Sequence, residues 1–264
     1  MSGPLRVDRP ADGVVLLTLD LPERRNAMTE ELTDAWRAAI AEIATDRSVR
    51  VVVVTGEGKA FCAGGDLSWL GEGDGSNGPA PIRLRDRMLP FYRTWLSIRE
   101  LEVPTIAALN GAAIGAGLCL ALGCDLRYAT PEAKLAMPFT ALGMHPGMAA
   151  TYLLPEAVGL PRAREMLFTG RVLTGEQAAS IGLVNDVFPA ERLLDEVLDI
   201  AGKAAATAPI ATRLTKRAMQ HGPRSFVEAL EWEALAQPVT LASQDLREGL
   251  RAQAERRTPV FRGL

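Results

Sequence analysis

The chain has 264 residues, a formal net charge of −3 and 48% hydrophobic residues, enough for a full hydrophobic core. The slight acidic excess argues against nucleic-acid binding, which usually goes with a basic excess. Three cysteines and two histidines without metal-type spacing argue against a zinc site. Together with the absence of a secretory signal at the start, they favour a reduced, cytoplasmic protein.

The first part of the chain alternates apolar strands with a helix. Residues 14–19 form a β-branched run that predicts a strand. Thr29 is placed to cap a helix, in which apolar residues recur at helical spacing as far as Ile43. Residues 49–54 and 105–109 predict two further strands, apolar on both faces, as in a sheet covered by helices. This order predicts a parallel βαβ series.

Residues 103–124 carry no charge over 22 positions, which is long enough to cross a bilayer. The stretch also contains Pro104, Asn110 and four glycines. We therefore interpret it as a buried strand, a glycine-rich turn and a buried helix, and expect no membrane span.

Helical patterns dominate after about residue 160. The predicted helices cover residues 163–168, 175–181, 191–207, 210–221 and 225–236. The sequence therefore predicts an α/β core over residues 1–195 and a helical C-terminal region over residues 196–264.

Two turns of small residues each follow a predicted strand. Residues 59–70, K-A-F-C-A-G-G-D-L-S-W-L, predict a strand, a turn and a helix that starts near Asp66, whose carboxylate can cap it. Gly115-Ala116-Gly117 joins a strand to a helix without side-chain bulk. Either turn alone is equally consistent with a plain tight turn. Together they could direct two backbone amides at one oxygen, which is an oxyanion hole.

In combination, the motifs of this chain resemble those of the crotonase, or enoyl-CoA hydratase/isomerase, superfamily. The resemblance covers nearly the whole chain. Its motifs are P-E-R-R-N-A-M (22–28), V-V-V-V-T-G-E-G-K-A-F-C-A-G-G-D-L (51–67), N-G-A-A-I-G-A-G (110–117), L-G-M-H-P-G (142–147), L-F-T-G (167–170), A-A-S-I-G-L-V-N (178–185), S-Q-D-L-R-E-G-L (243–250) and E-R-R-T-P-V-F (255–261).

The resemblance implies an α/β fold with a crotonase-type ββα spiral core and a helical C-terminal region. It implies a homotrimer or a dimer of trimers, in which residues 243–261 help to cover the coenzyme. The implied partner is an acyl-CoA thioester, with coenzyme A as part of the substrate and with no separate cofactor or metal.

The resemblance also implies roles for single residues. The N–H groups of Gly65 and Ala116 would form the oxyanion hole. Ala63 would contact the adenine through its carbonyl, and Arg25 would meet the phosphates, unless it is merely a solvated turn residue. The other residues implied to lie against the substrate are Ala27, Asp66, Leu67, Cys119 and Phe139.

Hydratases of this superfamily use two glutamates to hold and activate water, and by motif alignment these positions are Cys119 and Phe139 here. A phenylalanine cannot transfer protons, and a thiol with an unperturbed pKa of about 8.5 is a poor substitute. We therefore expect inefficient hydration, although the family label would be enoyl-CoA hydratase. His145 is the candidate catalytic replacement, unless it only hydrogen-bonds within its loop.

Other groups are also candidates for the chemistry. Cys119 could act as a nucleophile, and Glu72 and Asp74 could move inward from a glycine-rich loop. Three functions follow from these alternatives. The first is an enzyme that stabilises a thioester enolate, such as an isomerase or a decarboxylase using His145. The second is a non-catalytic acyl-CoA-binding protein, and the third is a structural protein on the same fold.

Overall fold

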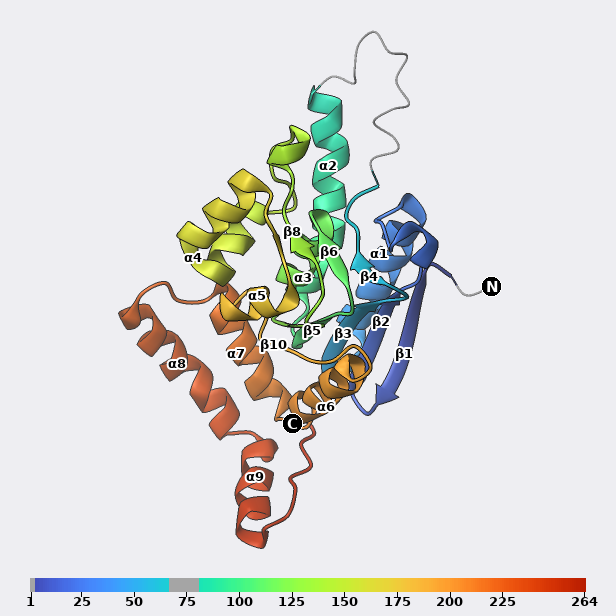
Figure 1. Cartoon of the computed structure of the whole chain (residues 1–264). Helices are drawn as coiled ribbons and strands as arrows, with labels where there is room; N and C mark the ends of the chain where they lie inside the picture. Colours follow the sequence, from blue (N-terminus) through green and yellow to red (C-terminus); the bar gives the residue numbers. More distant parts are fainter. Residues whose placement is uncertain (1–2, 67–80) are drawn as a thin grey trace.

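Two β-sheets and the helices around them form the body of the molecule (Figure 1). The computed structural model describes residues 3–66 and 81–264. The larger sheet has the order β1-β2-β3-β5-β7-β10 and the smaller one has the order β4-β6-β8-β9. The strands are β1 (Leu5–Ala11), β2 (Val14–Leu19), β3 (Val51–Gly56), β4 (Ala60–Cys62), β5 (Thr105–Leu109), β6 (Ala112–Ile114), β7 (Leu126–Ala129), β8 (Leu135–Ala136), β9 (Val172–Leu173) and β10 (Asp186–Val187).

Helices surround both sheets and continue to the C-terminus. They are α1 (Glu30–Thr45), α2 (Pro81–Leu96), α3 (Ala116–Gly123), α4 (Ala150–Thr169), α5 (Gly175–Ser180), α6 (Leu193–Ala205), α7 (Pro209–His221), α8 (Phe226–Leu241) and α9 (Gln244–Glu255). The hydroxyl of Thr29 accepts a hydrogen bond from Leu32 N at 3.2 Å and so caps α1, as predicted.

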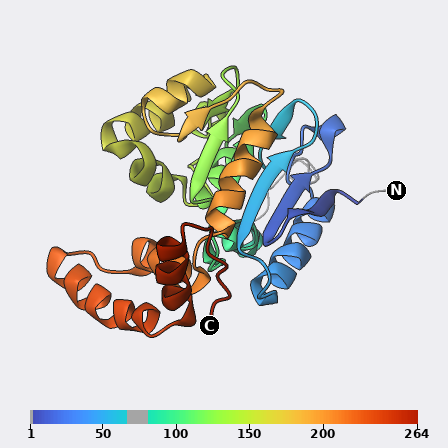
Figure 2. The ribbon, with the colours of Figure 1, turned by 90° about the horizontal axis from the view of Figure 1, so that it is seen from below.

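The central strands β2, β3 and β5 are parallel and buried, as the sequence predicts. Side chains alternate between the faces of a strand, so Val52 and Val54 pack in one core with α1, and Val51 and Val53 pack in another with α6. Figure 2 shows α6 (orange) packed on one face of the sheet, roughly along the strands. The strand predicted at residues 49–54 begins two residues later, because Val49 N donates to Asp46 O in a turn.

The uncharged stretch at residues 103–124 contributes β5, β6 and α3. Every residue of α3 is buried. Within residues 3–66 and 81–264, no helix is long and apolar enough to cross a membrane. The predicted strand and buried helix are confirmed, but a second short strand, β6, which was not predicted, lies between them.

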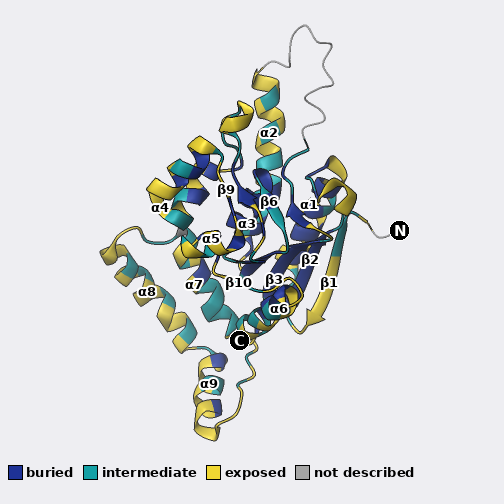
Figure 3. Cartoon of the chain, in the orientation of Figure 1, coloured by how far each residue is buried: buried dark blue, intermediate teal, exposed yellow. Residues whose placement is uncertain are grey.

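The C-terminal helices differ in how closely they pack. The ammonium of Lys216 in α7 is buried and forms an ion pair with Asp125 at 2.7 Å. In contrast, α8 has no buried residue and extends away from the sheets (Figures 1 and 3). The tail after α9 is held by Asp245, whose carboxylate accepts hydrogen bonds from Arg262 N and Gly263 N.

Candidate active site

The two glycine-rich turns follow strands that lie side by side. β4 and β6 are parallel, with Ala60 opposite Ala112 and Cys62 opposite Ala113. Parallel strands end at the same edge of a sheet, so the turn after Cys62 and the turn after Ile114 meet there.

The contact between the turns is tight enough to require glycine. A Cβ built on Gly64 would lie 2.8 Å from Ile114 O and 3.7 Å from Ala116 N. A Cβ built on Gly117 would lie only 2.2 Å from Cys62 O. Gly64 and Gly115 have φ angles of +106° and +54°, which L side chains rarely adopt. The sequence therefore places small residues where two backbones touch.

The amides of Gly65 and Ala116 are available to a ligand. Met28 N donates to Gly64 O at 2.8 Å, and Asp66 N donates to Met28 O at 3.4 Å. Peptide groups alternate in direction along an extended segment, so the Gly65 N–H points away from Met28. Ala116 is the first residue of α3, where an N–H has no partner within the helix. Within the described ranges, neither amide donates to a protein group.

Aromatic rings lie against both turns. A Cβ built on Gly65 would lie 4.0 Å from Phe91 Cζ, and one built on Gly115 would lie 3.6 Å from Phe139 Cζ. Phe91 and Phe139 are both half-buried and pack against the main core. These contacts make the surroundings of the two amides apolar, and in such surroundings a hydrogen bond to a charged oxygen is strengthened.

Cys119 lies one turn into α3 and is fully buried. Its Sγ is 3.9 Å from Met137 Sδ and 3.6 Å from Gly147 O. Burial raises the pKa of Cys119 well above its ordinary value, and the neighbouring Cys62 raises it further. The side chain is therefore a neutral thiol at pH 7, which does not favour the nucleophile alternative.

A second segment of the implied ligand site lies beside the first turn. Ala63 N donates to Arg25 O at 3.0 Å. Arg25 and Asn26 both have positive φ, which is uncommon for residues other than glycine. The buried amide of Asn26 maintains this geometry, because its Nδ2 donates to Glu57 O and Ala60 O and its Oδ1 accepts from Leu21 N. Arg25 itself is exposed, as a phosphate contact requires.

Other predicted site residues lie nearby or outside the described ranges. Asp66 is half-buried, and its carboxylate accepts a hydrogen bond from Arg24 at 2.8 Å. Ala27, also half-buried, lies between the Arg25 turn and Met28. Leu67, the helix predicted to start near Asp66, and the loop acids Glu72 and Asp74 lie outside the described residues.

His145 is exposed, and its Nδ1 lies 2.8 Å from Pro146 O. This contact fits the alternative predicted for His145 from the sequence, in which the side chain only hydrogen-bonds within its own loop. Within the described residues, the imidazole forms no hydrogen bond with Gly65, Ala116 or Cys119. Its catalytic role stays a prediction.

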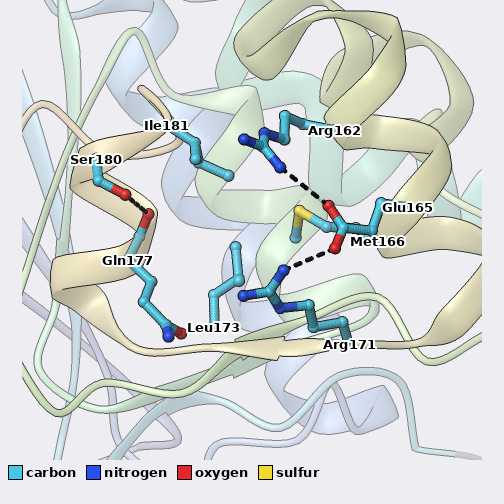
Figure 4. A pocket seen from close by; sticks show the side chains of 8 residues that line it. All are labelled: Arg162, Glu165, Met166, Arg171, Leu173, Gln177, Ser180 and Ile181. Carbon is cyan, nitrogen blue, oxygen red and sulfur yellow. Dashed lines mark hydrogen bonds and ion pairs between the residues drawn. The ribbon is translucent and has the colours of Figure 1, made fainter.

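A separate cavity of about 160 Å³ lies between α4 and α5 (Figure 4). Its charged side chains pair with one another, since Glu165 accepts from Arg162 at 3.3 Å and from Arg171 at 2.7 Å. Ser180 donates to Gln177 O in the same cavity. None of the predicted site residues lines it. Groups of three or more His, Cys, Asp or Glu that could hold a metal are also absent from the described residues.

Sequence reasoning missed the contribution of α2 to the site. Trp95 stacks on Trp36 of α1 with ring centroids 5.0 Å apart, and its Nε1 donates to Thr33. The same helix places Phe91 against Gly65 and Tyr92 against Gly147. The closely spaced aromatic residues 91, 92 and 95 were the available signal, but they do not reveal which face of the helix meets the site.

Comparison with known proteins places these features in context. The family model for enoyl-CoA hydratase/isomerase matches residues 9–263. The 2,3-dehydroadipyl-CoA hydratase of Escherichia coli is 36% identical over 251 residues, 95% of each chain. An enoyl-CoA hydratase structure from Bacillus anthracis has a TM-score of 0.92 at 34% identity, covering 99% of this chain and 100% of that one. One from Mycobacterium smegmatis has a TM-score of 0.88 at 30% identity, covering 98% and 99%. The matched regions include both glycine-rich turns.

Proposed function

Because the chain belongs to the enoyl-CoA hydratase/isomerase family and has the crotonase fold, we propose that it binds an acyl-CoA thioester and stabilises the enolate of that thioester. In this proposal the enolate oxygen accepts hydrogen bonds from Gly65 N and Ala116 N. Ala63 and Arg25 contact the coenzyme portion, and the acyl group lies among Cys119, Phe139 and their neighbours.

The observation that supports this proposal is the contact between the two turns, which brings to one edge of β4 and β6 two amides that have no hydrogen-bond acceptor among the described residues. Two such donors hold an oxygen in the plane between them, and the α3 N-terminus adds a favourable field for negative charge. Removing one donor of an oxyanion hole typically costs about 3–4 kcal/mol of transition-state stabilisation.

The proposed reaction class follows from the side chains near these amides. Cys119 offers a neutral thiol and Phe139 an aromatic ring at the positions assigned to the two hydratase glutamates. Isomerisation or decarboxylation of the thioester therefore fits this site better than efficient hydration. The E. coli relative is named for hydration of 2,3-dehydroadipyl-CoA, and the substrate of the present chain is proposed only as an acyl-CoA thioester.

A non-catalytic acyl-CoA-binding protein remains the second candidate, because the same amides would serve binding alone. The proposal extends to a homotrimer or dimer of trimers in the cytoplasm, with no cofactor other than the coenzyme A of the substrate.

The test removes one amide with little damage to the helix that carries it. Proline is well accepted at the first position of a helix, so Ala116→Pro deletes the N–H while α3 can still form. Gly65→Pro deletes the other N–H, and Ala116→Gly is the matched control that keeps the amide. Calorimetry would measure the binding of free coenzyme A and of acetoacetyl-CoA, whose enolate is a stable mimic.

We expect either proline variant to weaken acetoacetyl-CoA binding by about 10²-fold relative to coenzyme A binding. The Ala116→Gly variant should retain the preference for the thioester. Equal weakening of both ligands would show that the thioester oxygen is not held by these amides.

A further inference from the structure

A tyrosine on α2 lies beside the proposed thioester site. Tyr92 is half-buried, and its ring packs directly on Gly147. A Cβ built on Gly147 would lie 2.4 Å from Tyr92 Oη and 3.0 Å from its Cζ. Any side chain at position 147 would therefore displace the phenol.

Gly147 also connects Tyr92 to Cys119. Cys119 Sγ lies 3.6 Å from Gly147 O, so the phenol and the thiol meet at the same residue. Burial raises the pKa of Tyr92 above its ordinary value, and the nearby Cys119 raises it further. Cys119 is the position assigned to one of the hydratase glutamates, so the hydroxyl of Tyr92 lies next to the place of a lost proton-transfer group.

The hydroxyl of Tyr92 is available for a ligand. Among residues 3–66 and 81–264, no protein group forms a hydrogen bond with it. The adjacent residue Phe91 lies over Gly65. The rings of Phe91 and Tyr92 meet edge to face, with their centroids 6.2 Å apart. One turn of α2 therefore reaches both the oxyanion-hole residue Gly65 and the Cys119 side of the site.

We propose that Tyr92 is a catalytic proton-transfer residue that replaces the missing carboxylates. This rests on the proposed function, because the substrate is the enolate held by Gly65 and Ala116. In the forward step the O–H bond of Tyr92 breaks, its proton forms a C–H bond with the α-carbon, and the electron pair of the enolate becomes that bond. The phenolate then recovers a proton from water. In the reverse step, the phenolate takes an α-proton and the enolate forms again.

The direction of the transfer depends on pH in a defined way. Tyr92 is neutral at pH 7 and so acts as an acid, whereas removal of an α-proton requires the phenolate, which forms only as the pH rises. Among the described residues, the titratable group that raises the pKa of Tyr92 is Cys119, and the pKa of Cys119 is itself raised. The segment around Gly147 contributes main-chain atoms at this contact.

The experiment follows exchange of the α-hydrogens of butyryl-CoA in D₂O by proton NMR, between pH 7 and 10, after subtraction of the enzyme-free rate. We expect the wild-type rate to rise about tenfold per pH unit and Tyr92→Phe to lower it by about 10²-fold. The phenylalanine keeps the ring that packs on Gly147, so a purely structural role would leave exchange intact. Tyr152→Phe, at a 57% exposed tyrosine on α4, is the matched control and should exchange like the wild type.

Calorimetric binding of butyryl-CoA separates this proposal from the proposed function. Wild-type and Tyr92→Phe proteins should bind the thioester alike. Unchanged exchange in Tyr92→Phe overturns the role of Tyr92, as does exchange that disappears in Cys119→Ala but persists in Tyr92→Phe. Wild-type protein that binds butyryl-CoA without exchanging its α-hydrogens also overturns it, while failure to bind any thioester rejects the proposed function itself.

Discussion

The absence of a Cβ atom at Gly117 allows the two turns to approach each other closely. The Cα of Gly117 lies so close to Cys62 O that one additional methyl group would overlap it, with a separation of 2.2 Å. Such an overlap must be relieved by moving either α3 or β4, and each of these elements leads into one of the two amides. The position of Ala116, whose amide we propose to hold the ligand oxygen, therefore depends on a neighbour without a side chain.

The cysteines provide a prediction at the same scale. Burial raises the pKa of Cys62 and of Cys124 to about 12, and it raises that of Cys119 as well. Since the thiolate is the reactive form, the native protein at pH 8 should react negligibly with an aromatic disulfide reagent. Unfolding in guanidinium should release three equivalents. Rapid reaction of one equivalent in the native state would support Cys119 as a nucleophile.

The motif alignment, which assigns Cys119 and Phe139 to the two glutamate positions, predicts slow hydration. General acid–base groups typically contribute about 10²–10⁴-fold to a rate, and neither Phe139 nor the neutral thiol of Cys119 can supply this. We expect crotonyl-CoA hydration at least about 10²-fold slower than by a glutamate-bearing relative, measured by loss of absorbance of the conjugated thioester. Ordinary hydratase turnover would contradict the motif alignment.

At the scale of elements, helices are attached to the sheets by a few specific contacts. α2 is anchored by the Trp36–Trp95 stack. α7 is anchored by Lys216, whose ammonium donates to Val103 O at 2.7 Å and pairs with Asp125. Asp125 also accepts from Thr105 N at the start of β5, so this one cluster joins α7 to the large sheet.

Breaking this cluster should destabilise the protein. Removal of one partner of a buried ion pair typically costs about 3–5 kcal/mol, because the other charge stays buried. We therefore expect Lys216→Met to lower the free energy of unfolding by about 3 kcal/mol in urea titration. Lys203→Met is the matched control, since its pair with Asp199 on α6 is exposed and should contribute little. Equal effects of the two changes would disprove the anchoring role of Lys216.

At the scale of the whole molecule, α8 leaves an apolar surface uncovered. Its side chains Phe226, Leu230 and Leu235 are 77%, 52% and 76% exposed. Phe226 and Leu230 are four residues apart and so share one face of α8, and exposed apolar side chains that lie together are typical of a protein–protein interface. In the proposed homotrimer, we expect α8, which extends from the sheets in Figure 3, to contact another subunit.

We expect sedimentation velocity at micromolar concentration to show trimers or hexamers. A Phe226→Asp/Leu230→Asp double variant should shift the protein to monomers, because aspartate would be buried without a partner in such an interface. Val7→Asp, at a 50% exposed position on β1, is the control and should leave assembly unchanged. A stable wild-type monomer would contradict the predicted assembly.

Local sequence was sufficient for several of the elements and for the small residues of the two turns, but it did not predict β1 or α2. The β-branched run at residues 14–19, the Thr29 cap and the glycines at 64, 115 and 117 act over a few residues, so their patterns predict structure directly. The family motifs likewise indicate two turns with a shared role. The first residue of β3 was harder to predict from the sequence, because it depends on the turn at Asp46 and on hydrogen bonds to Gly13.

Long-range packing was needed to show what surrounds those turns. Tyr92 and Gly147 are 55 positions apart in the sequence, and no local pattern indicates that the phenol of one rests on the backbone of the other. That contact exists because α2 is oriented by the tryptophan stack against α1. Burial in the main core, beside Met137 and Gly147, likewise raises the pKa of Cys119. Which titratable group meets a ligand depends on burial and on helix orientation, and both are properties of the assembled fold.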